Sequence, residues 1–200
     1  MKKCFSLILM LIFLCAGCSK DLSKGTIDEV SYEETLEATN YVKIETTKNK
    51  VILIELFPEV APITVENFQQ LVADGFYDNL IFHRVIDDFM IQTGDPLGTG
   101  IGGSDETIKG EFANNGVENN LSHSRGVVSM ARRGDDMDSA SSQFFIVQTD
   151  STYLDGDYAA FGKVIDGMDT VDKIAKVATD MNDKPTTPQR IRSIRFVNIK

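Results

Sequence analysis

Across residues 51–199 the chain alternates short runs of β-branched, aliphatic and aromatic residues with turn-forming residues. Such runs are typical of strands. They fall at 51–57, 80–85, 89–93, 126–131, 143–148, 161–165 and 191–199. Two other segments repeat apolar residues at helical spacing, one beginning at Pro62 and ending before Gly75, the other at 168–177. Many short strands with two isolated helices predict a mainly β fold, a closed β-barrel capped by two α-helices.

The first residues of the chain have the pattern of an export signal. Lys2 and Lys3 precede an apolar run that is shorter than the roughly 20 residues a membrane-spanning helix needs, and this pattern fits a secretory signal peptide. The small residues before Cys18 resemble a lipobox, although a cysteine stands three places before Cys18, where Leu is usual. We therefore expect removal of residues 1–17 and lipidation of Cys18. An ordinary signal peptide and a retained anchor are the alternatives.

The positions of the cysteines limit how the rest of the chain is stabilised. All three lie within the first eighteen residues, so a processed chain keeps only Cys18. Neither a disulfide nor a thiolate metal site is then possible, even in an oxidising compartment. The formal charge of −10 becomes more negative when two lysines are removed, and an acidic body is a poor match for a phosphate backbone. We expect no nucleic-acid partner.

The composition divides the chain into a tether and one domain. Residues 18–40 are charged and sparse in large apolar side chains, which predicts a lipidated cysteine followed by a flexible tether, with a short helix around 29–36 as the alternative. A flexible segment of this length spans roughly 25 Å on average. Residues 41–200 suit a single domain with a sizeable core.

One stretch concentrates the candidate functional residues. Residues 82–96 read Phe-His-Arg-Val-Ile-Asp-Asp-Phe-Met-Ile-Gln-Thr-Gly-Asp-Pro. This stretch strongly resembles the cyclophilin signature, F-H-R-[IV]-I-x-x-F-M-x-Q-x-G-D. The resemblance continues from about Tyr41 to Ile199 through separate blocks at 66–68, 98–100, 126–131, 142–146, 154–156 and 161–164. The compact connection at 75–78 is similar to the prokaryotic branch of the family.

The resemblance implies a fold and an activity. The fold is a closed eight-stranded antiparallel β-barrel capped by two α-helices, and the activity is peptidyl-prolyl cis–trans isomerisation. Rotation about an X–Pro bond faces a barrier of about 18–20 kcal/mol but breaks no bond, so neither nucleophile, metal nor cofactor is expected. A donor aimed at the prolyl nitrogen would stabilise the twisted state alone. By family position Arg84 is that catalytic donor, and Gln92 would hold its guanidinium and meet the substrate backbone.

The same resemblance assigns a substrate-binding surface. Phe89 and Met90 lie beside Arg84 in the motif and would form an apolar cup for the proline ring, with Phe144 in the core instead. Arg132 and Arg133 depart from the usual small polar residue and would make the rim basic. Tyr153 stands where many members have Trp, and Tyr158 where many have His. The expected substrate-binding residues are Phe89, Met90, Ala131, Arg132, Gln143, Phe145, Tyr153, Leu154 and Tyr158.

Simpler interpretations exist for each feature taken alone. An apolar residue such as Phe145 is more often core than pocket, and an arginine is most often a surface ion pair. His83 and His123 are expected to be packing residues. Gly98, Gly100 and Gly103 match a dinucleotide-binding pattern, but no βαβ unit surrounds them. A cluster of aspartates at 135–138 lacks the glycine and closing glutamate of a calcium loop.

The leading hypothesis is therefore a monomeric, membrane-anchored, extracytoplasmic isomerase whose partners are proline-containing segments of exported proteins. A binding module with the same fold is the main alternative, and the presence of both Arg84 and Gln92 favours the enzyme. A nutrient-binding lipoprotein is disfavoured because the chain is too short for two lobes.

Overall fold

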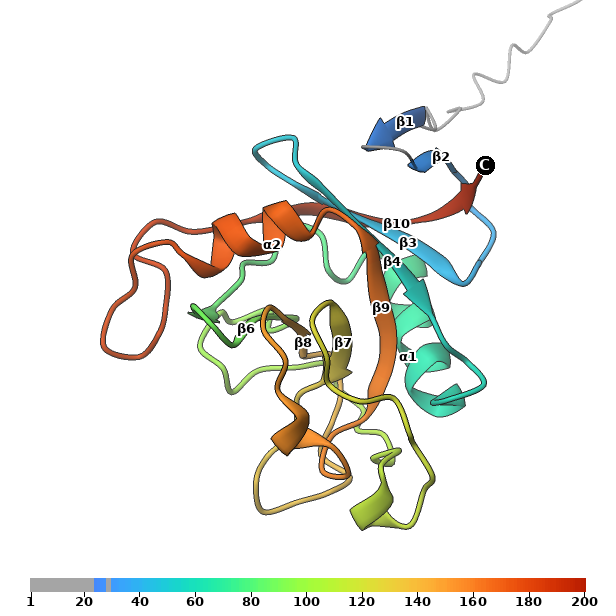
Figure 1. Ribbon diagram of the computed structural model, residues 1–200, viewed down its shortest axis with the longest axis vertical. Helices are drawn as coiled ribbons and strands as arrows, with labels where there is room; N and C mark the ends of the chain where they lie inside the picture. Colours follow the sequence, from blue (N-terminus) through green and yellow to red (C-terminus); the bar gives the residue numbers. More distant parts are fainter. Residues whose placement is uncertain (1–23, 28–29) are drawn as a thin grey trace, which may run out of the picture.

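The computed structural model describes residues 24–27 and 30–200 (Figure 1). The predicted signal peptide and Cys18 lie outside the described residues. Within the part of the chain that is described, no helix combines the length and apolar character that crossing a membrane requires.

The described chain is mainly β with two α-helices, as predicted. The helices are α1 (Pro62–Ala73) and α2 (Met168–Ala175), which lie apart in Figure 1 and contribute side chains to the same core. Ten antiparallel strands form one sheet in the order β1-β2-β10-β3-β4-β9-β7-β8-β6-β5. The strands are β1 (Lys24–Ile27), β2 (Val30–Glu34), β3 (Tyr41–Thr46), β4 (Val51–Leu56), β5 (Arg84–Ile86), β6 (Met90–Thr93), β7 (Val127–Met130), β8 (Phe144–Val147), β9 (Ala160–Asp166) and β10 (Ile191–Ile199).

The closed eight-stranded barrel is not confirmed. Among the described residues, the two ends of the predicted barrel meet at an isolated bridge between Ile81 and Arg190. Two backbone hydrogen bonds of 2.9 Å support it, from the Phe82 amide to the Gln189 carbonyl and from the Ile191 amide to the Leu80 carbonyl. The strand predicted at 80–85 is correspondingly displaced to β5. No continuous ladder closes the sheet, because β5 is only three residues long and β10 pairs further along with β2 and β3.

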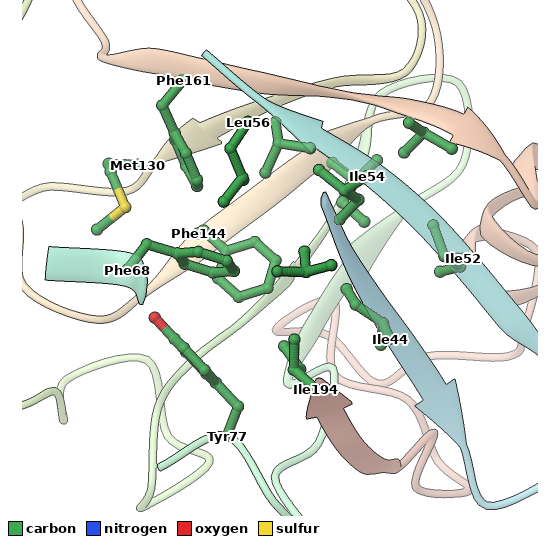
Figure 2. Close-up of a cluster of buried hydrophobic side chains, with 14 of the residues drawn as sticks. Ile44, Ile52, Ile54, Leu56, Phe68, Tyr77, Met130, Phe144, Phe161 and Ile194 are labelled. Atoms are coloured by element: carbon green, nitrogen blue, oxygen red, sulfur yellow. The ribbon is translucent and has the colours of Figure 1, made fainter. Parts of the chain in front are cut away.

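The core lies on the inner face of this curved sheet and is built around four aromatic side chains (Figure 2). The ring of Phe68, from α1, lies 5.2–5.3 Å from the rings of Tyr77, Phe144 and Phe161. The hydroxyl of Tyr77 donates to the Ser142 carbonyl at 3.1 Å, and burial raises the pKa of this phenol. Phe144 is thus a core residue, as predicted.

Helix α1 is closed at both ends by groups that satisfy its backbone. Pro62 occupies the start, and the buried Glu111 carboxylate accepts from the Thr64 amide at 2.8 Å. At the other end Gly75 has φ of 69°, and its amide donates to the Val72 carbonyl at 3.1 Å. A residue in this left-handed conformation commonly terminates a helix, and glycine adopts it without a Cβ penalty. The predicted helix end at Gly75 is confirmed.

The tether prediction is wrong for its last part. Residues 30–34 form strand β2, which pairs with the C-terminal end of β10, so neither a flexible segment nor the alternative short helix is found there. Tyr32 packs in a buried cluster with Leu53 and Val197, which point away from the main core. The outer face of the sheet is apolar at this place, and β2 covers it.

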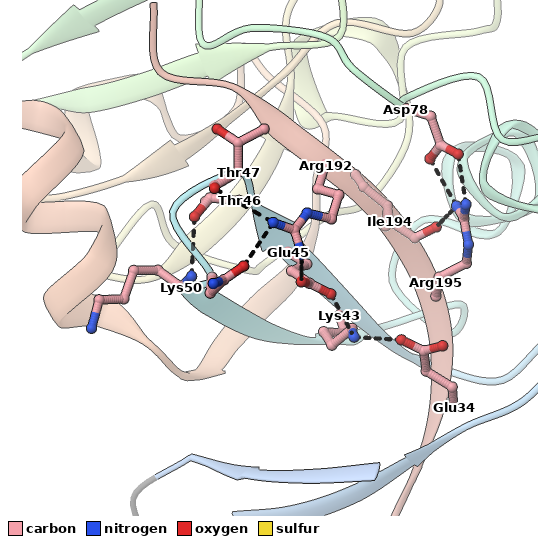
Figure 3. Close-up of polar contacts among 11 residues, drawn as sticks. Glu34, Lys43, Glu45, Thr46, Thr47, Lys50, Asp78, Arg192, Ile194 and Arg195 are labelled. Atoms are coloured by element: carbon pink, nitrogen blue, oxygen red, sulfur yellow. Dashed lines mark hydrogen bonds and ion pairs between the residues drawn. The ribbon is translucent and has the colours of Figure 1, made fainter. Parts of the chain in front are cut away.

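A polar network accompanies this cover (Figure 3). Lys43 is only 2 % exposed, and its ammonium group contacts the carboxylates of Glu34 and Glu45, the latter at 3.1 Å. Burial alone would lower the pKa of Lys43, but the two carboxylates raise it above its usual value. Glu45 also pairs with Arg192 at 2.7 Å. The network joins β2 to β3 and β10.

Candidate active site

A second apolar cluster lies on the outer face of the sheet, separate from the core. Side chains alternate between the two faces of a strand. Phe144 therefore points into the core, whereas its neighbour Phe145 joins Met90 and Val127 in the outer cluster. Phe89, from the turn before β6, and Leu154, from a short 3-10 helix (Thr152–Leu154), pack against it. This cluster is the apolar wall of a surface cavity.

The cavity has a volume of about 660 Å³, large enough for several residues of a peptide. It brings together most of the residues that the sequence resemblance assigned to the site, although they come from separate strands and loops. Those lining it are Arg84, Phe89, Met90, Gln92, Ala131, Arg132, Phe145, Leu154 and Tyr158. Gln143 and Tyr153 lie beside it.

Arg84 stands at the mouth of the cavity with 42 % of its side chain exposed. It faces Gln92 across the β5–β6 ladder. Within the described part of the chain no hydrogen bond joins these two side chains: the Gln92 amide donates to Gln143 Oε1 at 2.8 Å, and Arg84 Nε donates to Asp183 Oδ2 at 3.3 Å. The direct support of Arg84 by Gln92 therefore remains a prediction, and the observed partner is Asp183.

Gln143 connects the cavity to a neighbouring groove of about 320 Å³, which Ala131, Arg132 and Arg133 also line. The Gln143 amide donates to the carbonyls of Gly100 and Gly102 at 3.0 and 2.6 Å. Gln92 and Gln143 thus form a chain of amides between the cavity and the glycine-rich loop. Amides held in this way present defined donors and acceptors to a peptide backbone.

The two tyrosines noted in the sequence occupy different environments. Tyr158 lines the cavity, and its ring lies 5.9 Å from that of Phe145 in an edge-on arrangement. Tyr153 is 69 % exposed and lies on the rim, with its ring 5.9 Å from Phe89. Tyr153 could meet only the part of a ligand that extends beyond the cavity.

The basic rim expected from the two arginines is partly neutralised. The guanidinium of Arg132 lies 4.9 Å from the centre of the Tyr158 ring, and its Nε donates to the Asp157 carbonyl at 2.9 Å. Arg133 pairs with Asp136 at 2.8 Å. The Arg132 charge is held against the ring rather than extended toward solvent.

The two histidines differ in their surroundings. His123 is buried and bonds Asp155 at 2.8 Å and Ser129 at 3.0 Å, as expected for a packing residue. Ser129 is fully buried, so this Asp–His–Ser chain is not a nucleophilic triad. His83 lines the cavity, yet neither of its buried ring nitrogens has a hydrogen-bond partner among the described residues. Burial lowers the pKa of both imidazoles.

The glycine-rich segment is a loop along the cavity rather than a nucleotide-binding turn. Gly98 and Gly100 have φ of 61° and 88°, and no helix follows them. The Asp95 carboxylate accepts from the amides of Thr99 and Gly100 at 2.8 and 2.6 Å. Burial opposes ionisation of Asp95, but these backbone donors lower its pKa. In residues 24–27 and 30–200 no three His, Cys, Asp or Glu residues are grouped so as to hold a metal ion.

Sequence reasoning missed one side of the cavity. Asp180, Asn182 and Lys184 line it from the loop between α2 and β10. The polar, turn-forming run at 180–183 marks a loop in the sequence, but nothing in the pattern shows that this loop reaches Arg84.

The fold and the cavity define a class of protein: a curved antiparallel sheet whose outer face carries a partly apolar cavity with a guanidinium at its edge. The family model for cyclophilin-type peptidyl-prolyl cis-trans isomerases matches residues 41–196. The chain therefore belongs to the cyclophilin-type peptidyl-prolyl cis–trans isomerase family.

Individual relatives support the assignment. The chain is 42 % identical over 151 residues to peptidyl-prolyl cis-trans isomerase ppi1 of Schizosaccharomyces pombe, covering 75 % of this chain and 94 % of that protein. It is 47 % identical to peptidyl-prolyl cis-trans isomerase-like 3 of Rhizopus delemar over 72 % of this chain and 86 % of the relative. Both relatives are eukaryotic proteins, so they lend no support to the prokaryotic branch or to a lipoprotein form.

A solved structure agrees with the fold. The crystal structure of a Cryptosporidium parvum cyclophilin-type isomerase, determined in the presence of the dipeptide Ala-Pro, has a TM-score of 0.71 and 35 % sequence identity. The match covers 78 % of this chain and 97 % of that one.

Proposed function

We propose that the cavity isomerises X–Pro bonds by donating a hydrogen bond from Arg84 to the prolyl nitrogen of the twisted amide. One observation carries this proposal: a half-exposed guanidinium stands at the mouth of a cavity whose wall is formed by Phe89, Met90 and Phe145. The apolar wall suits a proline ring. A guanidinium offers several hydrogen-bond donors in one plane.

The physical basis is differential stabilisation. In a planar amide the prolyl nitrogen shares its lone pair with the carbonyl and accepts poorly. In the twisted state the lone pair is released, so a donor beside the nitrogen stabilises that state more than either isomer. A turnover of ~10³ s⁻¹ against an uncatalysed ~10⁻² s⁻¹ requires roughly 7 kcal/mol of such stabilisation. Gln92 and Gln143 would hold the flanking backbone.

The substrates we propose are proline-containing segments of unfolded or folding proteins. The Ala-Pro dipeptide used with the Cryptosporidium parvum relative supports this class. The open cavity and its adjoining groove would admit a chain segment rather than a compact small molecule. We propose that the protein works on these segments as a monomer.

A protease-coupled assay on a peptide with one X–Pro bond tests the proposal. We expect the purified protein to accelerate the slow phase in proportion to its concentration. Arg84→Ala should remove most of the acceleration while peptide binding persists. A wild-type protein that binds the peptide but leaves the slow phase unchanged would instead be a proline-binding module.

The location is a separate proposal. We propose that the protein is exported and anchored outside the cytoplasm through a lipid on Cys18, in the manner of a bacterial lipoprotein, where it assists the folding of exported proteins. The sequence of residues 1–18 supports it. Intact mass of the membrane-extracted protein should show loss of residues 1–17 and acyl chains on Cys18. Recovery of soluble, unmodified wild-type protein would contradict the anchor.

A further inference from the structure

The loop between α2 and β10 is fastened tightly to the rim of the cavity. The Asp180 carboxylate accepts from the amides of Asn182 and Lys184 at 2.8 and 3.1 Å, which closes the loop on itself. Lys184 Nζ donates to the Gly98 carbonyl at 2.6 Å, and the Val85 amide donates to the Asp183 carbonyl at 2.9 Å. The loop is therefore attached to both the glycine-rich loop and strand β5.

These attachments aim one carboxylate at Arg84. Asp183 adopts a φ of 59°, a conformation that residues other than glycine rarely adopt but that aspartate and asparagine tolerate. Its Oδ2 lies 3.3 Å from Arg84 Nε across 99 residues of sequence, and the two side chains are similarly exposed, 42 % and 43 %. Val85, whose amide binds the Asp183 backbone, is the residue next to Arg84.

The geometry of the contact leaves the terminal amino groups of Arg84 available to donate hydrogen bonds. Only Nε is engaged by Asp183, and among the described residues neither terminal amino group of Arg84 has a hydrogen-bond partner. A bidentate pair would occupy two donors and fix the fork on the carboxylate. A single contact through Nε instead restrains the guanidinium and leaves both terminal amino groups free to donate to a substrate.

From this geometry we propose that Asp183 is a positioning residue, which holds the Arg84 guanidinium in the orientation that it needs over the prolyl nitrogen. The inference rests on the proposed role of Arg84. Gln92, the residue expected to do this work, donates to Gln143 instead. Misplacement of a catalytic group by about 1 Å can cost two orders of magnitude in rate, whereas an exposed ion pair contributes little to stability. Asp183 should therefore matter for turnover and hardly at all for folding.

Two substitutions isolate the side chain without disturbing the loop. Asp183→Gly removes the carboxylate and is compatible with the positive φ, and Asp183→Asn keeps an acceptor without the charge. Asp88 provides a matched control, because it is an exposed aspartate with φ of 61° in the neighbouring β5–β6 turn. Asp88→Gly and Asp88→Asn change charge and backbone freedom in the same way, and no hydrogen bond joins Asp88 to Arg84 among the described residues.

The experiment measures kcat and KM on one neutral X–Pro peptide for all four variants. We expect Asp183→Gly to lower kcat about 3- to 10-fold with KM changed less than twofold, Asp183→Asn to retain most activity, and both Asp88 variants to match the wild type. Protection of the Val85 amide from hydrogen exchange should persist, which shows that the loop stays attached. Measurements of ¹⁵N NMR relaxation should show a more mobile Arg84 Nε–H group in Asp183→Gly alone.

Combination with Arg84→Ala separates the two hypotheses. The double variant Arg84→Ala/Asp183→Gly should be no slower than Arg84→Ala. If Arg84→Ala is severely impaired but Asp183→Gly equals its Asp88 control, the positioning role is wrong and the proposed function stands. A higher kcat in Asp183→Gly would also overturn it, because Asp183 would then be withholding the arginine. Near-normal activity of Arg84→Ala would reject the proposed function itself.

Discussion

Two apolar patches lie on the outer face of the same sheet, and the chain covers one of them but leaves the other exposed. Over β3, β4 and β10, the residues Leu53 and Val197 are covered by Tyr32 of β2 and become fully buried. Over β6 and β8, Met90 and Phe145 are bordered by loops, which leave a cavity of about 660 Å³. One patch is sealed by the protein's own strand, and the other stays open to a ligand.

The cations beside the two patches differ in the same way, one being buried and paired and the other partly exposed. Lys43 is buried and pairs with the Glu34 and Glu45 carboxylates, whereas Arg84 is half-exposed and, among the described residues, makes one side-chain hydrogen bond, of 3.3 Å through Nε. A buried charge requires full pairing, because an unpaired one is costly. A charge that acts on a substrate must keep donors free. Lys43 should therefore affect stability alone, and Arg84 activity alone.

The largest expected effect is on turnover. Arg84→Ala should lower kcat/KM by about 10²–10³-fold, as expected when one donor to a transition state is removed. Because the Arg84 side chain is half-exposed, the urea midpoint should change little. Rates from the protease-coupled assay and a urea denaturation curve on the same sample check both halves. A folded variant with near-wild-type turnover contradicts the mechanism.

At the covered patch we expect a smaller effect, and one on stability rather than on turnover. Lys43→Met keeps an apolar chain of similar length but leaves the Glu34 and Glu45 carboxylates without their shared ammonium group. Loss of one partner of a buried pair costs about 3–5 kcal/mol; since Glu34 and Glu45 remain 14 % and 21 % exposed, we expect about 2–3 kcal/mol less free energy of unfolding. Activity per folded molecule should be unchanged. Reduced turnover with normal stability would show that the two patches are coupled.

The two patches also differ in how far the sequence predicted them. The period of two places Phe144 inside and Phe145 outside, and the family motif adds Arg84 and Met90, so most of the open patch could be predicted. The covered patch was missed because β2 contributes few apolar residues among charged ones, and that composition suggested a tether. The Arg84–Asp183 contact spans 99 residues, and no local pattern encodes it. The sheet was predicted to close, but β5 is only three residues long, and the preceding Ile81 meets Arg190 through an isolated bridge alone.

The smallest expected effect is that of pH, and it distinguishes the guanidinium that we propose acts in catalysis from the buried imidazoles. Burial lowers the pKa of His83 and of His123 below the ordinary 6.5. Their contribution to stability is therefore fully present above about pH 6.5 and is lost as the pH falls below it, because the unfolded chain then binds protons that the folded protein excludes.

The resulting slope is at most about 1.4 kcal/mol per pH unit for each histidine. The proposed mechanism uses no general acid or base, so kcat should stay nearly flat from about pH 6 to 9. Asp95, Lys184 and Arg84 all act electrostatically on His83, and the first of these favours its protonation while the two cations oppose it. Urea midpoints and kcat measured at pH 5, 6, 7 and 8 test both expectations. A change of kcat near pH 6.5 that is absent in His83→Ala would show that His83 takes part in catalysis. The open patch would then contain a second catalytic group beside the one that we propose.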